Sequence, residues 1–350
     1  MPDLQCQIDP MVDFLVGLLN TPSPTGYSAE ATAYVEQAFQ ALDINGLTLE
    51  RTPKGSLIIT WPGEQNTSPR GLTAHVDTLG LMVREIKGNG RLKLTMLGGY
   101  MWNAVEFEGV TVQTYTGQRY RGTVVPIKAS VHVHRDANEL PRNDENMEVR
   151  LDVRTKSADE TRALGIEVGD YVFVDPRVEV TDTGFIRSRH LDDKASVATI
   201  YGAFQALKNA ALCPTQSVVV VIANYEEVGH GAASGFPTTM QELVAVDMAA
   251  VGSGQNSDEF SVGICVKDGG GPYHVELTRK LRTLADEAGI PYKTDIYPYY
   301  GSDGEAYWRA GGAAQVALIG PGVDASHAYE RTHKDSLLHS AHLIARFMLS

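Results

Sequence analysis

Cysteine is scarce in this sequence of 350 residues: it has three, Cys6, Cys213 and Cys265, and they lie far apart. An odd number of scattered cysteines without a CxxC pair indicates neither a disulfide framework nor a thiolate metal site. The N-terminal segment MPDLQCQIDP also lacks the basic and apolar regions of a signal peptide. We therefore expect a cytoplasmic protein with reduced thiols.

Positive charge and long apolar runs are lacking as well. Lys and Arg number 30 against 43 Asp and Glu, which gives a formal net charge of −13. Nucleic acids and anionic membranes bind clustered positive charge, so neither is an expected partner. The longest apolar run, Ser217–Tyr225, has about half of the ~20 residues that cross a bilayer.

Several common catalytic motifs are missing. The sequence has no GxxxxGK[ST] phosphate loop and no GxSxG nucleophile turn. The glycine cluster Gly269–Gly271 lacks the strand and helix of a dinucleotide site, so we interpret it as a flexible turn. These absences leave acid–base or metal chemistry as the main enzymatic options.

The periodicity of apolar residues divides the chain into two kinds of region. Residues 1–82 and 187–350 contain helical patterns and continuous β-branched runs, which are typical of an α/β domain with a mixed sheet. Residues 83–186 contain short runs that alternate apolar and polar side chains, which are typical of antiparallel strands. The sequence therefore predicts an α/β domain interrupted by a small all-β, barrel-like domain.

Acids and histidines follow the apolar runs of the α/β region. Taken singly, most have a structural explanation: an H-x-D pair can end a strand, and paired aspartates can cap a helix. Two adjacent acids directly after a buried strand are harder to explain, because α/β sheets bind ligands at that edge. The residues concerned are His75 and Asp77, Asp192 and Asp193, Glu226 and Glu227, Asp247, and the C-terminal His327 and His333.

Together these residues predict a metal centre. Carboxylates and imidazoles without thiols are the ligand mix of a pair of divalent ions. Such a pair needs one bridging carboxylate, terminal ligands on each ion and a free acid that handles the proton of a water molecule.

The motifs AHVDTLGLMV, LDDK, NYEEVG and VAVDMA, with the His-bearing C-terminal segment, resemble the dinuclear-metal aminopeptidases of the M42 (glutamyl aminopeptidase) family over nearly the whole chain. The resemblance implies a phosphorylase/hydrolase-like domain and two divalent ions, expected to be zinc, with cobalt or manganese as alternatives. It implies the following roles: His75, Glu227 and Asp247 as terminal ligands, Asp192 as the bridging ligand with a cis peptide to Asp193, Glu226 as general base, and Asp77 as the residue that orients His75.

The fifth ligand departs from the family pattern. The family usually has an Arg-Tyr-x-His-Ser turn, whereas this sequence reads YERTHKDSL. From its position relative to the chain end we expect His333 to be the ligand, with His327 as the alternative. The departures resemble a subgroup that accompanies synthesis of an acetylated dipeptide osmoprotectant, so the need for a free N-terminal amine stays open.

We therefore predict a metal-dependent hydrolase of peptide bonds, specifically an aminopeptidase acting on small peptides. The alternatives are an amidohydrolase acting on an N-acylated peptide amide, a metal-independent glycosidase with two catalytic carboxylates, and a catalytically inactive metal-binding protein. The resemblance also implies a homo-oligomer, built from dimers and often dodecameric, in which the inserted domain makes contacts.

Overall fold

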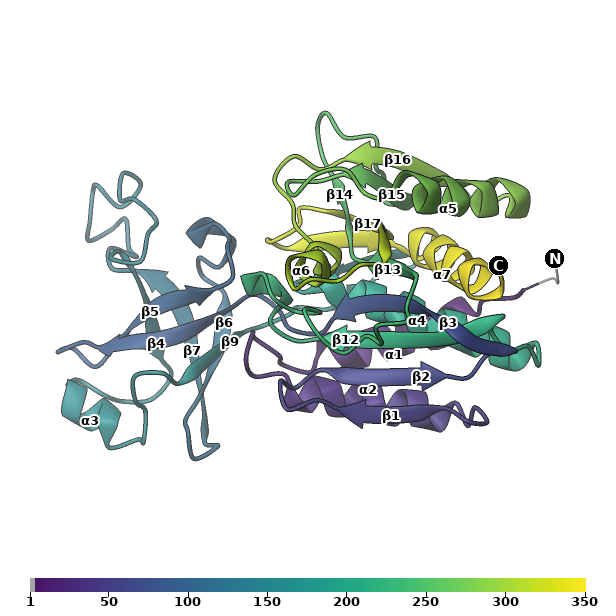
Figure 1. Ribbon diagram of the computed structural model, residues 1–350. Helices are drawn as coiled ribbons and strands as arrows, with labels where there is room; N and C mark the ends of the chain where they lie inside the picture. The colour runs from purple at the N-terminus through teal and green to yellow at the C-terminus, as the bar shows by residue number, and fades with distance from the viewer. Residues whose placement is uncertain (1–3) are drawn as a thin grey trace. The chain divides into compact units, whose positions relative to one another are not determined.

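The computed structural model describes residues 4–350 and shows two compact units (Figure 1). One contains the chain up to Asp77 together with Arg177–Ser350, and the other contains Thr78–Pro176. The predicted insertion of a β-rich domain into an α/β domain is thus confirmed. Its limits differ from the predicted 83–186, because its first strand already begins at Gly80, and because residues 177–186 contain one strand and the start of another that belong to the large sheet. Residues 1–3 of the predicted first segment lie outside the described residues.

A mixed sheet forms the centre of the α/β unit. Within residues 4–350 it has twelve strands, nine of which follow one another in the order β1-β2-β12-β3-β13-β17-β18-β11-β10, while β14 and β15 pair with β17 and β16 pairs with β15. In that order the nine strands are β1 Thr48–Arg51, β2 Leu57–Trp61, β12 Gln216–Ala223, β3 Gln65–His75, β13 Glu242–Val246, β17 Gln315–Asp324, β18 Glu330–His333, β11 Phe185–Ser188 and β10 Glu179–Val180; the others are β14 Ala249–Val251, β15 Val262–Lys267 and β16 Tyr292–Ile296.

Both faces of this sheet are buried, which explains its continuous apolar runs. In β13, Val244 and Val246 pack into one hydrophobic cluster, while Leu243 and Ala245 pack into another on the opposite face. Successive side chains of a strand point to opposite faces, so a run such as ELVAV is buried throughout.

Helices cover the two faces unequally. Helices α1, α4 and α7 contact one another and share the larger hydrophobic cluster, whereas α6 packs against β13 and β17 with the smaller cluster (Figure 1). The helices of this unit are α1 Ile8–Leu19, α2 Ala29–Ala41, α4 Leu191–Asn209, α5 Val275–Ala288, α6 Asp303–Arg309 and α7 Lys334–Leu349, with a short 3-10 turn at Glu226–Val228. None of the described helices is long and apolar enough to cross a membrane.

The inserted unit is a closed barrel of antiparallel strands. Its core is built by alternating residues such as Val110 and Val112, or Val172 and Val174, which all point inward. Around the barrel the strands are β4 Gly80–Ile86, β5 Leu92–Leu97, β8 Met147–Leu151, β7 Arg119–Pro126, β6 Gly109–Gln113 and β9 Tyr171–Val174; the unit also contains α3 Ala158–Arg162 and a 3-10 turn at Trp102–Ala104.

Strands β12, β3, β13 and β17 are the part of the fold that positions the site. They run parallel to one another, so their carboxyl ends meet at one edge of the sheet. In sheets of this kind ligands bind beyond the carboxyl ends of the strands.

Candidate metal centre

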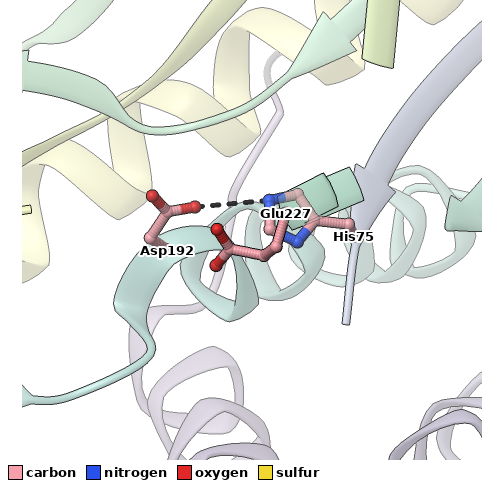
Figure 2. A group of neighbouring side chains, drawn as sticks. All are labelled: His75, Asp192 and Glu227. Atoms are coloured by element: carbon pink, nitrogen blue, oxygen red, sulfur yellow. Dashed lines mark ion pairs between the residues drawn. The ribbon is translucent and has the colours of Figure 1, made fainter. Parts of the chain in front are cut away.

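The predicted acids and histidines meet at this edge. His75 is the last residue of β3, Asp247 follows β13, and Glu226 and Glu227 form the turn just after β12. Asp192 lies in the first turn of α4, next to a cis peptide bond with Asp193. Figure 2 shows His75, Asp192 and Glu227 converging from three separate elements.

The ring of His75 is held in one orientation. Its Nδ1 lies 2.8 Å from the backbone carbonyl oxygen of Asp77. A carbonyl oxygen can only accept, so Nδ1 carries a proton and Nε2 is the nitrogen left for a metal. Nε2 is buried and has no hydrogen-bond partner among the described residues, although Oδ1 of Asp192 lies 3.3 Å away (Figure 2). A metal-bound histidine is fixed in the same way.

Asp192 faces a histidine with each of its carboxylate oxygens. While Oδ1 is the oxygen near His75, Oδ2 lies 3.2 Å from Nε2 of His327. The same nitrogen of His327 is 3.6 Å from Oε2 of Glu227. His327 therefore occupies the position that the sequence led us to expect for His333.

His333 is not part of the cluster, and both of its ring nitrogens are engaged elsewhere. Nδ1 accepts a hydrogen bond from the backbone N–H of Asp335 and so caps α7, while Nε2 lies 3.0 Å from the carbonyl oxygen of Thr183. The ring also packs between Phe185 and Phe260. Neither nitrogen has a lone pair left for a metal, so the preferred assignment of His333 needs correction.

Asp77 supports the site by two routes. The sequence predicted that it orients His75, and it does so with its backbone carbonyl, since its carboxylate is 3.7 Å from the ring. The carboxylate instead accepts hydrogen bonds from the backbone N–H groups of Glu226, at 3.1 Å, and Glu227, at 3.3 Å. The hydroxyl of Thr25 donates to it as well. Asp77 thus fixes the turn that carries both glutamates.

Glu330 is a supporting residue that no sequence motif indicated. It is 2% exposed, and its two carboxylate oxygens accept hydrogen bonds from the backbone N–H groups of Asp192, at 3.1 Å, and His327, at 3.0 Å.

Asp193 was expected only as the partner in the cis peptide. Its Oδ2 accepts a hydrogen bond from the backbone N–H of His75, and its buried Oδ1 has no partner among the described residues.

The carboxyl groups of the cluster repel one another. Burial, and then the neighbouring Asp192, raises the pKa of Asp247 to about 7 and that of Glu227 well above its usual value. Burial also raises the pKa of Glu226 well above its usual value, and Asp247 adds to the effect. For Asp192 burial acts in the same direction, but the facing side chains of His327 and then His75 outweigh it and lower the pKa.

The arrangement fits a divalent cation on three counts. Ligand atoms of His75, Asp192 and Glu227 lie within 4.8 Å of one another, as do those of His75, Asp193 and Asp247. The buried Nε2 of His75 and Oε1 of Glu227 have no hydrogen-bond partners among the described residues. Positive charge would also relieve the repulsion that raises these pKa values.

The cluster opens into a cavity of about 560 Å³. Asp192, Glu226, Glu227, Asp247 and His327 all line it, so the cluster is accessible to a small ligand. The remaining wall comes largely from the segment 297–302 and from α6.

Comparison with known proteins gives a consistent assignment. Residues 55–343 match the family model described as M42 glutamyl aminopeptidase. The chain is 47% identical over 339 residues to "Putative aminopeptidase YhfE" of Bacillus subtilis (strain 168), and the match covers 97% of both chains.

Solved structures share the fold at lower identity. A TET aminopeptidase from the archaeon Thaumarchaeota SCGC AB-539-E09 superposes with a TM-score of 0.86, at 17% identity and 97% coverage of each chain. The TET1 peptidase of Pyrococcus horikoshii, described as assembling into a tetrahedron or a large octahedral shell, gives 0.82 at 22% identity, with 97% and 99% covered. The family match spans most of the sequence, so the chain belongs to the M42 glutamyl aminopeptidase family, and the predicted class of metal-dependent aminopeptidase is confirmed.

Proposed function

We propose that the chain removes N-terminal residues from small peptides, with Glu226 as general base beside two divalent ions bridged by Asp192. The observation that carries this proposal is the geometry of Asp192, whose two oxygens each face the Nε2 of a different histidine. A carboxylate between two imidazoles is the arrangement expected of a bridging ligand.

Asp192 would serve both metal positions, and the other ligands would be divided between them. His75 and Asp247 would complete one position, and Glu227 and His327 would complete the second. A set of imidazole nitrogens and carboxylate oxygens suits zinc, and also cobalt or manganese. Ions bound here polarise a substrate carbonyl and make a water molecule more acidic.

Glu226 supplies the proton transfers. Its Oε2 lies 3.5 Å from Nε2 of His75, so the carboxylate is next to the proposed metal ligands. The other residues suffice as ligands, which leaves Glu226 free for proton transfer. We propose that it takes a proton from the attacking water and later gives it to the nitrogen of the leaving amine. The backbone N–H of Glu226 donates a hydrogen bond to the carboxylate of Asp77, which holds the turn in place. The carboxylate of Glu226 therefore stays directed at the cavity.

We also propose that the protein is a homo-oligomer. Its fold is that of the assembling TET1 peptidase, and the barrel unit exposes several large apolar side chains. The barrel is therefore the proposed contact surface. The cytoplasmic location stays a prediction from the sequence.

The test is a hydrolysis screen on metal-reconstituted full-length protein. Aminoacyl-anilides, free peptides, N-acetylated peptide amides and a cello-oligosaccharide are compared, each with and without a chelator. Cleavage of anilides and free peptides that is lost on chelation supports the proposal. Cleavage confined to N-acetylated substrates identifies an amidohydrolase instead, and chelator-resistant cleavage of the sugar identifies a glycosidase.

A further inference from the structure

The cavity beside the proposed metal ligands has a second acidic group. Glu305, on α6, lines the same cavity as Glu226 and Asp192. In an aminopeptidase the scissile carbonyl belongs to the N-terminal residue of the substrate. If a substrate binds with that carbonyl at the cluster, the remaining part of this cavity is available to the side chain of its first residue.

The carboxylate of Glu305 is buried and only partly satisfied. Its side chain is 7% exposed, and Oε2 forms an ion pair with Arg309 one helical turn away. Oε1 is buried and has no hydrogen-bond partner among the described residues. A buried acceptor without a donor is unfavourable, and a ligand that donates a hydrogen bond removes this penalty.

The surroundings fix the carboxylate in place. A Cβ atom added to Gly270 would lie 1.9 Å from Oε1, so the carboxylate occupies space that the missing side chain leaves open. Burial, and then the neighbouring Asp268, raises the pKa of Glu305 to about 7. Asp268 already accepts hydrogen bonds from the backbone N–H of Gly270 and the hydroxyl of Tyr273. A donor or cation that enters the cavity favours the ionised form of Glu305.

We propose that Glu305 determines specificity by accepting a hydrogen bond from the side chain of the substrate's first residue. Substrates whose first side chain ends in an ammonium or carboxamide group are preferred over aliphatic side chains of similar length. This inference rests on the proposed aminopeptidase function of the same cavity.

The experiment compares kcat/KM of the metal-loaded protein for the p-nitroanilides of lysine, glutamine, norleucine and glutamate. The wild type is expected to prefer the lysyl and glutaminyl substrates over the norleucyl substrate by about tenfold or more, because an unpaired buried acceptor disfavours a side chain without a donor. Glu305→Ala should bring both ratios close to one. Glu305→Gln should lose more of the preference for lysine than of the preference for glutamine, because its amide oxygen still accepts from a neutral donor but has no charge.

A matched control is Glu259→Gln. Glu259 is also a buried glutamate paired with an arginine, Arg331, but it does not line the cavity. This variant should keep the wild-type ratios. Unchanged ratios in both Glu305 variants overturn the inference, and so does a wild-type preference for the glutamyl substrate, which would assign recognition to Arg309.

A binding measurement separates this inference from the proposed function. If the wild type cleaves none of the anilides, the aminopeptidase function fails, and calorimetric titration with free lysine and norleucine then decides the role of Glu305. Tighter binding of lysine that is lost in Glu305→Gln supports the inference. Equal affinity of the wild type for the two amino acids overturns it.

Discussion

Asp192 and His327 lie side by side, with Oδ2 of the aspartate 3.2 Å from Nε2 of the histidine. They belong to segments more than 130 residues apart, and the buried carboxylate of Glu330 accepts a hydrogen bond from the backbone of each. One side chain thus sets the spacing of two proposed ligands. The relationship also identifies His327, rather than His333, as the histidine that shares Asp192 with His75.

Replacing His327 should remove a metal ligand. We expect His327→Ala to lower the metal content from about two ions per chain to about one, because a two-metal site depends on the terminal ligands of each ion. The measurement is elemental analysis after dialysis. The matched control is His333→Ala, which should keep both ions and lower only the melting temperature, because His333 caps α7 and packs between Phe185 and Phe260. A loss of metal in the His333 variant alone would restore the assignment made from the sequence.

The adjacent glutamates should respond differently to the same substitution. Glu226→Gln should keep the metal and lower kcat by roughly 10²–10⁴-fold, because glutamine cannot accept the proton. Glu227→Gln should instead lower metal occupancy, and excess metal should restore part of its activity. Parallel metal analysis and steady-state kinetics separate the two roles. Activity of Glu226→Gln within a few-fold of wild type would assign the base to another residue.

The sequence predicted the parts of the site that lie at the ends of visible apolar runs. His75, Glu226, Glu227 and Asp247 each follow such a run, and the parallel arrangement of β3, β12 and β13 brings them together. His327 follows β17 at the same edge of the sheet, so the apolar segment AQVALIGPGV was the signal that could have identified it.

Other features depend on tertiary contacts that leave no local pattern. Glu330 accepts hydrogen bonds from backbone N–H groups on two different segments. Nothing in the sequence near residue 330 indicates these contacts. The observed limits of the barrel unit also differ from the predicted ones. The alternating residues of β10 and β11 look like those of the barrel strands, but β11 pairs with β18 of the large sheet.

Glu330 should act on metal affinity without binding the metal itself. Glutamine at this position has one accepting oxygen, so one of the two backbone N–H groups would face an amide NH₂. We expect Glu330→Gln to weaken metal binding by about 10–100-fold, as is typical when a residue that orients ligands is changed. Competition with a chromophoric chelator measures this affinity. Glu259→Gln is again the control, and equal affinity in the two variants would show that Glu330 has only a structural role.

The barrel unit should carry the contacts of the oligomer. Several of its large apolar side chains are strongly exposed, among them Met101 at 68%, Tyr115 at 98% and Val168 at 65%. Changing these three to serine should lower the mass measured by light scattering, because exposed apolar side chains stabilise assemblies by their burial. Val275→Ser, at a residue of the α/β unit that is 60% exposed, is the control and should leave the mass unchanged. An unchanged mass in the triple variant would exclude these side chains from the interface.

The stabilising effect of metal should grow as the pH rises. Burial, and then Asp192, raises the pKa of Asp247 from 3.8 to about 7, so metal-free folded protein holds a proton that the unfolded chain releases. The stability that this group contributes is complete below about pH 4 and is lost as the pH rises through about 7. A divalent ion replaces the proton and removes this loss.

We therefore expect the increase in melting temperature caused by metal to be larger at pH 8 than at pH 5, measured by scanning fluorimetry with and without chelator. Asp247→Asn, which cannot ionise, should reduce this pH dependence. The same increase at both pH values in the wild type would show that Asp247 does not exchange a proton for metal.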